Sequence, residues 1–542
     1  MVLLLILVAV VIFSCIGLNN VSTKMGIPML LAFILLGIAF GNNGLVPIRF
    51  EDYSFAEDIC TVALIFIMFY GGFGTRWQSA RSVALEAGLM ASVGVLLTAG
   101  LIGLFCHFVL GWEWIESFLM GSVVSSTDAA SVFSILRSRK LGLKNNTAPL
   151  LEVESGSNDP CSYMLTVIML SLLNGQASGG QIVWMVFAQL VFGAGLGILI
   201  AKAAVWLMRR IHFSTSGFDS LFMFAVAIFA YAVPSLVGGN GYLSAYLAGI
   251  ILGNTDFQGK KTLVHFFDGI TSLMQVLIFF LLGLLARPAL LHRAVLPALA
   301  ILVFMTVVAR PASVFAILKP FGKYPFRQRT LVSFVGLRGA ASIVFAIMAT
   351  VGEETLLQHD LFNIVFVIVL LSIGVQGSLI PLVSRKLDMI DSGQDVLKTF
   401  NDYTEDTDVQ FSQIRITEDS PWNGSQIKDL GLPKGLIIAL IIREGHFVVP
   451  HGATCLQPAD LLVCGNKAFQ DAQIIQLVEH RLNANSKWVG HRIEEYPEGR
   501  NELVVLIKRG GENLIPRGST VLQADDVLVI NRLPEEIHDI EG

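Results

Sequence analysis

Long apolar segments set the strongest limit on how this chain can fold. They recur up to about residue 386 in blocks of about 18–25 residues, each long enough to cross a bilayer as a helix. The chain has 542 residues, of which 54% are hydrophobic and only 15% are charged. This composition is too apolar for a soluble domain of that length. We therefore predict an all-α polytopic membrane protein, and the net charge of -5 gives no reason to expect nucleic-acid binding.

Hydropathy predicts about 13 membrane spans. The first segment lacks the positively charged start of a signal peptide, so we interpret it as a span, although its "FSC" faintly resembles a lipoprotein cleavage site. The predicted ranges are 1–19, 26–41, 57–74, 83–109, 113–136, 148–174, 181–207, 217–236, 240–254, 264–286, 293–318, 328–351 and 360–384.

Loop charges predict the orientation of these spans. Loops after odd-numbered spans carry most of the Lys and Arg residues, such as Arg139 and Lys144. Loops after even-numbered spans carry only Arg49, Arg287 and Arg293. Because positive loops stay in the cytoplasm, we expect the N-terminus outside and the C-terminal tail inside. No cysteine belongs to a CxxC pair, so the sequence indicates neither a metal site nor a disulfide framework.

The tail contains an internal repeat. Trp422 matches Trp488 and Pro450 matches Pro516 at the same offset, within short β-branched runs and Gly/Pro turns. We expect a small α+β tail, with a helix at "QDAQIIQLVEHRL" between the repeats. The predicted divisions are a transmembrane domain at 1–387, a linker at 388–415, and repeats at 416–484 and 485–542.

The stretch "ESGSNDP" places polar and acidic side chains inside an apolar segment. In a helix, Glu154 lies four residues from Asn158, and Ser155 four residues from Asp159, which gives two adjacent polar rows. Pro160 removes a backbone donor and leaves a carbonyl free one turn earlier. Carbonyl, hydroxyl and carboxylate oxygens within one turn suit a small hard cation. The alternative is a polar cap at the start of a span.

Two further spans are interrupted by small and charged residues. "SSTDAASVFS" contains Thr127 and Asp128, and "GLRGAAS" contains Arg338 between glycines. Interrupted segments in corresponding halves of a chain indicate an inverted-repeat transporter with two crossed helices. A fixed cation on one broken helix and a carboxylate on the other could neutralise the half-helix dipoles. The alternative for either stretch alone is close helix packing through small residues.

Together, "SSTDAASVFSIL", "LEVESGSNDP", "FFDGITSLMQVLIFFLLGLL", "VVARPASVF" and "FVGLRGAASIVFAI" resemble the NhaP-type cation/proton antiporters of the sodium(potassium)/proton exchanger superfamily. The duplicated tail resembles the TrkA C-terminal domain of regulator-of-potassium-conductance modules. The resemblance implies a homodimeric secondary antiporter in a bacterial cytoplasmic membrane, and not an enzyme. A mobile core bundle would move against a dimerisation bundle. The partners would be protons, K⁺ or Na⁺ and the lipid bilayer, with no cofactor.

The resemblance also implies roles for residues of the crossing. Asp159 would bind either the cation or a proton, with ligands added by Ser155 and the Thr127 backbone. Asn158 would organise the crossing together with Asp128.

A second group of residues would support this site. Glu154 would pair with Arg338 and hold the geometry. Related proteins often carry an acidic residue where this chain has Tyr70, which leaves the choice of cation open. Asp268 is a structural hydrogen-bonding partner or a site residue, and for Arg310 we favour a structural role over a place on the ion path.

The tail offers cationic candidates for a regulatory ligand, for which the resemblance suggests a cyclic dinucleotide or another nucleotide. They are Arg443, His451, Arg509 and Arg517, and the alternative for each is solvated surface charge.

These residues predict the transport mechanism. A single carboxylate that accepts either ligand gives exchange by competition, because an empty, ionised Asp159 is costly to move through an apolar barrier. The neutral Asn158 beside it predicts one-for-one, electroneutral exchange. The competing classes are a Na⁺/H⁺ antiporter of the same fold, a ligand-gated cation channel and a proton-coupled symporter. The sequence lacks the "TVGYG" of a potassium filter, which disfavours the channel.

Overall fold

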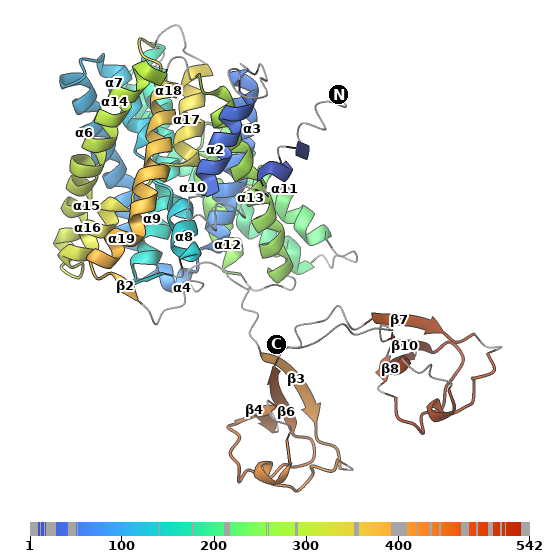
Figure 1. Ribbon diagram of the computed structural model, residues 1–542. Coiled ribbons are helices and arrows are strands. Elements are labelled where there is room, and N and C mark those ends of the chain that lie inside the picture. Colours follow the sequence, from blue (N-terminus) through green and yellow to red (C-terminus); the bar gives the residue numbers. More distant parts are fainter. Residues whose placement is uncertain are drawn as a thin grey trace. The chain divides into compact units, whose positions relative to one another are not determined.

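The computed structural model forms two compact units, Met1–Thr404 and Glu405–Gly542, which we describe separately (Figure 1). The predicted first span, 1–19, lies largely outside the described residues. The structure describes the chain except for residues 1–8, 11, 16, 18–28, 42–49, 51, 140, 176–177, 211–216, 256, 258–259, 288–290, 352–356, 392–408, 419, 433–435, 444–445, 468–475, 484–485, 497–501, 510–511, 515 and 533–542.

The first unit is a bundle of helices (Figure 1). Its described part holds 8 helices that are long and apolar enough to cross a membrane, together with three shorter apolar helices, which confirms an all-α polytopic membrane domain. The helices are α2 (Met29–Phe40), α3 (Tyr53–Gly74), α4 (Trp77–Ala80), α5 (Ala84–Leu89), α6 (Val95–Phe108), α7 (Trp114–Val124), α8 (Ala129–Ser138), α9 (Thr147–Leu173), α10 (Gly179–Arg210), α11 (Phe218–Leu236), α12 (Gly241–Gly253), α13 (Lys260–Leu285), α14 (Leu291–Phe304), α15 (Arg310–Leu318), α16 (Phe326–Phe334), α17 (Ala340–Val351), α18 (Leu361–Leu371) and α19 (Ser378–Lys386).

Several predicted spans are not uniform α-helices. Three contain a π-helical turn, at Met90–Gly94, Met305–Ala309 and Ser372–Gly377. Two are broken, between α7 and α8 and between α16 and α17. Both breaks fall where small and charged residues interrupt the apolar pattern, so the predicted interruptions are confirmed.

Helix packing divides the unit into two sets. The helices α2, α3 and α10–α13 pack mainly among themselves, and we call them the scaffold bundle. The helices α5–α9 and α14–α19 form the core bundle. The two bundles meet chiefly where α17 packs on α3 and where α9 packs on α12.

A short segment after α19 ties the end of the membrane unit to the loop before α9. The strands β1 (Gly142–Leu143) and β2 (Ile390–Asp391) pair antiparallel. The side chain of Lys144 binds the carboxylate of Asp388 at 2.9 Å, and this ion pair holds the pKa of Asp388 below its usual value. Figure 1 shows β2 at the same end of the bundle as α4 and α16. We call this end the tail side.

The second unit contains two antiparallel sheets with the same strand topology. The predicted helix at "QDAQIIQLVEHRL" is wrong, because its described part contains a strand, Gln476–Arg481, that pairs antiparallel with the strand Val527–Arg532. The first strand of this unit, Val409–Arg415, lies inside the segment predicted as a linker, 388–415. One sheet has the order β3-β6-β4-β5, with β3 (Val409–Arg415), β4 (Ile437–Arg443), β5 (His446–Val448) and β6 (Leu461–Lys467); the other has the order β7-β10-β8-β9, with β7 (Gln476–Arg481), β8 (Glu502–Arg509), β9 (Glu512–Leu514) and β10 (Val527–Arg532).

Candidate functional site

The two broken helices cross at their interruptions. The backbone N–H of Asp128 donates to the carbonyl of Leu337 at 2.9 Å, which joins the two extended segments. A Cβ on Gly339 would lie 1.9 Å from Asp128 Oδ2 and 2.6 Å from its Cβ. Only glycine therefore lets the chain at position 339 lie this close to the side chain of Asp128.

Opposite charges lie at the ends of the half-helices that face the crossing. The Arg338 guanidinium is fully buried and donates to the carbonyls of Ser125, at 3.1 Å, and Ser126, where α7 ends. Asp128 accepts from the backbone N–H of Ser131 at 3.1 Å and from its hydroxyl at 2.5 Å, where α8 begins. A cation at carbonyl ends and a carboxylate at N–H ends both oppose the helix dipoles.

The helix α9 brings the predicted cation ligands to this crossing. The Ser155 hydroxyl donates to the Thr127 carbonyl at 2.7 Å and accepts from the Ala129 N–H at 2.9 Å. Asn158 Nδ2 donates to Thr127 Oγ1 at 2.6 Å. The structure therefore places Ser155, Asn158 and Thr127 in one hydrogen-bonded group, with Asp159 one residue further along α9.

Ser126 is a contact of Asp159 that the sequence did not single out. Its hydroxyl donates to Asp159 Oδ1, while its carbonyl accepts from Arg338. Ser126 directly precedes Thr127 and Asp128 in the broken segment. Its position beside these two candidates is the sequence signal that could have identified it. Asp159 therefore receives a neutral donor, and Ser126 also links it to the guanidinium of Arg338.

The ion pair of Glu154 differs from the prediction. Glu154 binds Arg310 with an Nη2–Oε1 distance of 2.5 Å, and not Arg338, whose guanidinium is hydrogen-bonded to the carbonyls at the end of α7. Both paired side chains are buried, with exposed fractions of 1% and 4%. Gly336 makes room for this pairing, since a Cβ there would lie 2.9 Å from Arg310 Nε. The carboxylate of Glu154 is thus paired with the guanidinium of Arg310.

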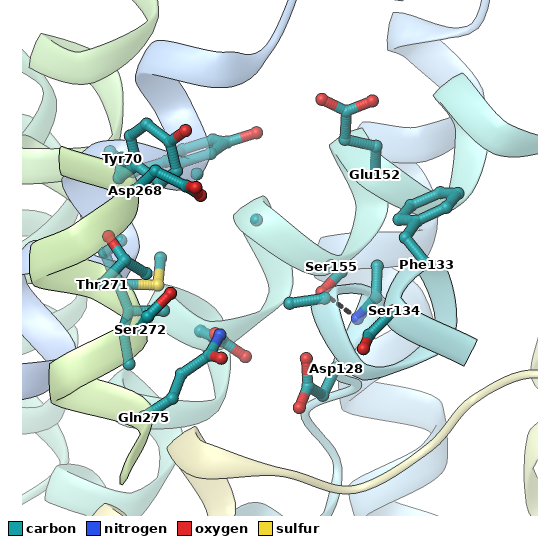
Figure 2. Close-up of a pocket in the computed structure, with 18 of the residues that line it drawn as sticks. Tyr70, Asp128, Phe133, Ser134, Glu152, Ser155, Asp268, Thr271, Ser272 and Gln275 are labelled. Atoms are coloured by element: carbon teal, nitrogen blue, oxygen red, sulfur yellow. Dashed lines mark hydrogen bonds between the residues drawn. The ribbon is translucent and has the colours of Figure 1, made fainter. Parts of the chain in front are cut away.

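A cavity of about 370 Å³ lies between the two bundles and reaches Asp159 (Figure 2). Figure 2 shows Asp128, Ser155 and Glu152 on one wall, and Tyr70 and Asp268 on the other. Glu152, for which we predicted no role, therefore lies at this cavity. The scaffold wall also carries Thr271, Ser272 and Gln275, which with Asp268 form a polar stripe along α13.

The tail candidates fall into two groups. Arg443 binds Asp460 at 2.8 Å, and Arg509 binds Asp526 at 2.7 Å, in equivalent positions of the two repeats. Each arginine is therefore held inside its own module. His451 and Arg517 are exposed, each beside a tight turn.

Crossed broken helices that meet a carboxylate on the wall of a cavity, in a polytopic bundle, are typical of a membrane transporter of the inverted-repeat class. Residues 8–386 match the sodium/hydrogen exchanger transmembrane domain, and residues 411–467 and 477–541 match the TrkA-C domain. The chain therefore belongs to the sodium/hydrogen exchanger family, whose members are transporters and not enzymes.

Individual relatives agree with this assignment. The chain is 33% identical to the K(+)/H(+) antiporter NhaP2 of Shewanella sp. (strain MR-4), over 82% of this chain and 78% of that protein. It is 34% identical to the K(+)/H(+) antiporter NhaP of Alkalimonas amylolytica, over 79% of this chain and 75% of that one. The structure of the sodium proton antiporter MjNhaP1 from Methanocaldococcus jannaschii superposes with a TM-score of 0.62 at 22% identity, covering 71% of this chain and 99% of that chain, and shares its fold.

Proposed function

We propose that this protein exchanges K⁺ for H⁺ across the membrane and that Asp159 is the group for which the two ions compete. The observation that carries the proposal is the place of Asp159, at the crossing of the broken helices and on the wall of the cavity. The names of the relatives support K⁺ as the cation. Oxygen atoms of Ser155, Thr127 and Asp159 supply the kind of ligand that a hard monovalent cation takes.

We attribute one-for-one exchange to Asp159 alone among the carboxylates of the cavity, which also include Asp128, Glu152 and Asp268. Glu154 is neutralised by Arg310, and Asp128 is held at the start of α8 by Ser131. Asn158 carries no charge. Asp159 then crosses the barrier neutralised by either ligand, and the cost of moving it empty couples the two fluxes.

Substitution of Asp159 tests the proposal. In proteoliposomes with a trapped pH dye, we expect K⁺ to drive proton movement by the parent protein, and we expect Asp159→Asn to abolish it because an amide cannot release a proton. Asp219→Asn, the same change at the start of α11 in the scaffold bundle, serves as the matched control and should retain exchange. Activity of Asp159→Asn equal to that of the control would overturn the assignment.

The choice of cation is measured in the same assay with K⁺, Na⁺, Rb⁺ and Li⁺. Tyr70 lines the cavity at the position where related proteins often carry an acid, and a phenol is a weaker cation ligand than a carboxylate. This favours the larger, more easily dehydrated K⁺ over Na⁺.

A rate that depends on voltage, with a non-zero reversal potential under symmetrical ion gradients, would contradict electroneutral exchange.

We further propose that the chain acts as a homodimer in a bacterial cytoplasmic membrane, with its N-terminus outside and the tail side in the cytoplasm. The TrkA-C repeats would adjust transport on binding a small anionic ligand such as a cyclic dinucleotide. Because Arg443 and Arg509 are held in ion pairs, His451 and Arg517 are the better ligand candidates. Deletion of residues 400–542 should move the pH at which exchange begins, and an unchanged value would contradict regulation by the tail.

A further inference from the structure

The cavity ends at Asp159, and a contact between the two bundles begins at the next residue. On α9 the cavity is lined by Glu152, Ser155, Gly156 and Asp159, and by no described residue further along that helix. The carbonyl of Pro160 instead accepts a hydrogen bond of 2.8 Å from Nδ2 of Asn240, the residue that precedes α12. Both groups are buried.

Aromatic rings extend this contact away from the tail side. Tyr163, one turn after Asp159, packs edge-on against Tyr242 of α12, with ring centroids 4.9 Å apart. Tyr242 also meets Phe345 of α17 at 6.3 Å. Tyr242 is only 2% exposed, and these rings pack together beyond Asp159, toward the end of the bundle opposite the tail side.

Contacts within the scaffold bundle are of a different kind. A Cβ on Gly249 would lie 2.1 Å from the carbonyl oxygen of Phe69, and one on Gly283 would lie 2.2 Å from that of Ile34. Such backbone-to-backbone contacts fix α12 on α3 and α13 on α2. The Asn240–Pro160 and Tyr163–Tyr242 contacts depend on side chains that can change partners, so this interface can separate while each bundle stays intact.

Asn240 has two separate hydrogen-bonding roles. Its Oδ1 accepts from the backbone N–H of Leu243 at 3.0 Å and caps α12, while its Nδ2 crosses to Pro160. A serine at this position would keep the capping acceptor but could not reach Pro160 as a donor. The second role can therefore be removed without removing the first.

We propose that Asn240 is a positioning residue that holds the exchanger in its tail-side-open conformation, because it ties the scaffold bundle to α9 directly beside Asp159. The bond must break for Asp159 to reach the opposite side. Loss of the bond shifts the conformational equilibrium away from the tail-side-open state. This inference rests on the proposed exchange by alternating access, and it does not depend on which cation is exchanged.

The ratio of apparent cation affinities at the two membrane faces measures the equilibrium between the tail-side-open state and the state open to the opposite side. When two states bind the same ion from opposite faces, the ratio of the two half-saturating concentrations follows the equilibrium between the states, whatever their starting populations. We expect Asn240→Ser to raise the tail-side value relative to the opposite-side value about fivefold, as for the loss of one neutral hydrogen bond. The measurement uses the full chain in vesicles of both orientations.

Asn254→Ser is the matched control. Asn254 ends the same helix, and its Nδ2 donates to the carbonyl of Thr75 at 2.8 Å, within the scaffold bundle. Its substitution should lower stability and leave the ratio unchanged. Tyr163→Leu, which removes the ring contact but not the hydrogen bond, should shift the ratio in the same direction as Asn240→Ser and provides a second test if that variant does not fold.

Two results would overturn the inference: a ratio in Asn240→Ser equal to that of the parent, or an equal shift in Asn254→Ser. The proposed function fails separately, and in the parent protein. A parent that exchanges Na⁺ in place of K⁺ corrects the cation and leaves the ratio measurable with Na⁺. A parent that exchanges none of the four cations refutes the exchange itself.

Discussion

Neutralising Glu154 and Arg310, singly and together, tests the buried ion pair that supports the crossing. The two side chains are 2.5 Å apart and almost fully removed from solvent. The substitutions are Glu154→Gln, Arg310→Gln and both combined. Each single change leaves one charge buried without its partner, whereas the combination leaves two neutral amides that can hydrogen bond with each other.

The expected magnitudes follow from burial. Removing one partner of a buried pair costs about 3–5 kcal/mol, because the remaining charge keeps its desolvation penalty. At about 2 °C per kcal/mol for a domain of this size, each single variant should unfold about 6–10 °C below the parent. The double variant removes both penalties, so its loss should be at least about 2 kcal/mol smaller than the sum of the single losses.

Thermal unfolding of the full chain in detergent, at one fixed scan rate, measures this coupling. A second cycle with Glu154→Gln and Arg338→Gln compares the pairing expected from the sequence. We expect strong coupling for Arg310 and weaker coupling for Arg338, whose guanidinium binds the carbonyls of Ser125 and Ser126. Additive losses in the first cycle, or a larger coupling in the second, would refute the pairing of Glu154 with Arg310.

Two further predictions concern the crossing and the tail. Gly339→Ala should displace Asp128 from the start of α8 and cost about 1–3 kcal/mol, whereas Gly100→Ala, which has open space around it, should be tolerated; thermal unfolding compares the two. Asp460→Asn should weaken the first tail sheet by about 2 kcal/mol, seen as faster hydrogen exchange there with the second sheet as internal control. Hydrogen bonds from Arg443 hold the pKa of Asp460 below its usual value, so this contribution is present above about pH 4 and is lost as the pH falls further.

The sequence was sufficient for the helical architecture and for the place of the crossing. A span needs a long apolar run whatever surrounds it, so hydropathy alone locates the helices. The broken segments were equally visible, because polar residues such as Asp128 and Arg338 are costly in lipid unless they serve a site. The grouping of Ser155 and Asn158 on one side of α9 followed from helix periodicity.

Partners that are distant in the chain were harder to predict. Two buried arginines, Arg310 and Arg338, were candidates to pair with Glu154, and their spacing along the chain does not show which of them does. The structure decides for Arg310 because Gly336 leaves room for it. The strand β7 was predicted as a helix because its pairing with β10 is invisible in a local window. The signal that could have found it was the repeat, since β3 and β7 occupy equivalent positions in the two sheets.

One stripe of α12 shows how residue size can carry information that periodicity does not. Tyr242, Tyr246, Gly249 and Gly253 follow a spacing of three and four residues and therefore share one face of the helix. The tyrosines meet α9 of the core bundle, where a Cβ on Gly156 would collide with the Tyr246 ring at 2.4 Å, and the glycines meet the backbone of α3. The same stripe thus changes from side chains that can separate to glycines that fix the helix. A hydropathy pattern counts all four as one packing face, whereas their sizes distinguish an interface that moves from one that does not.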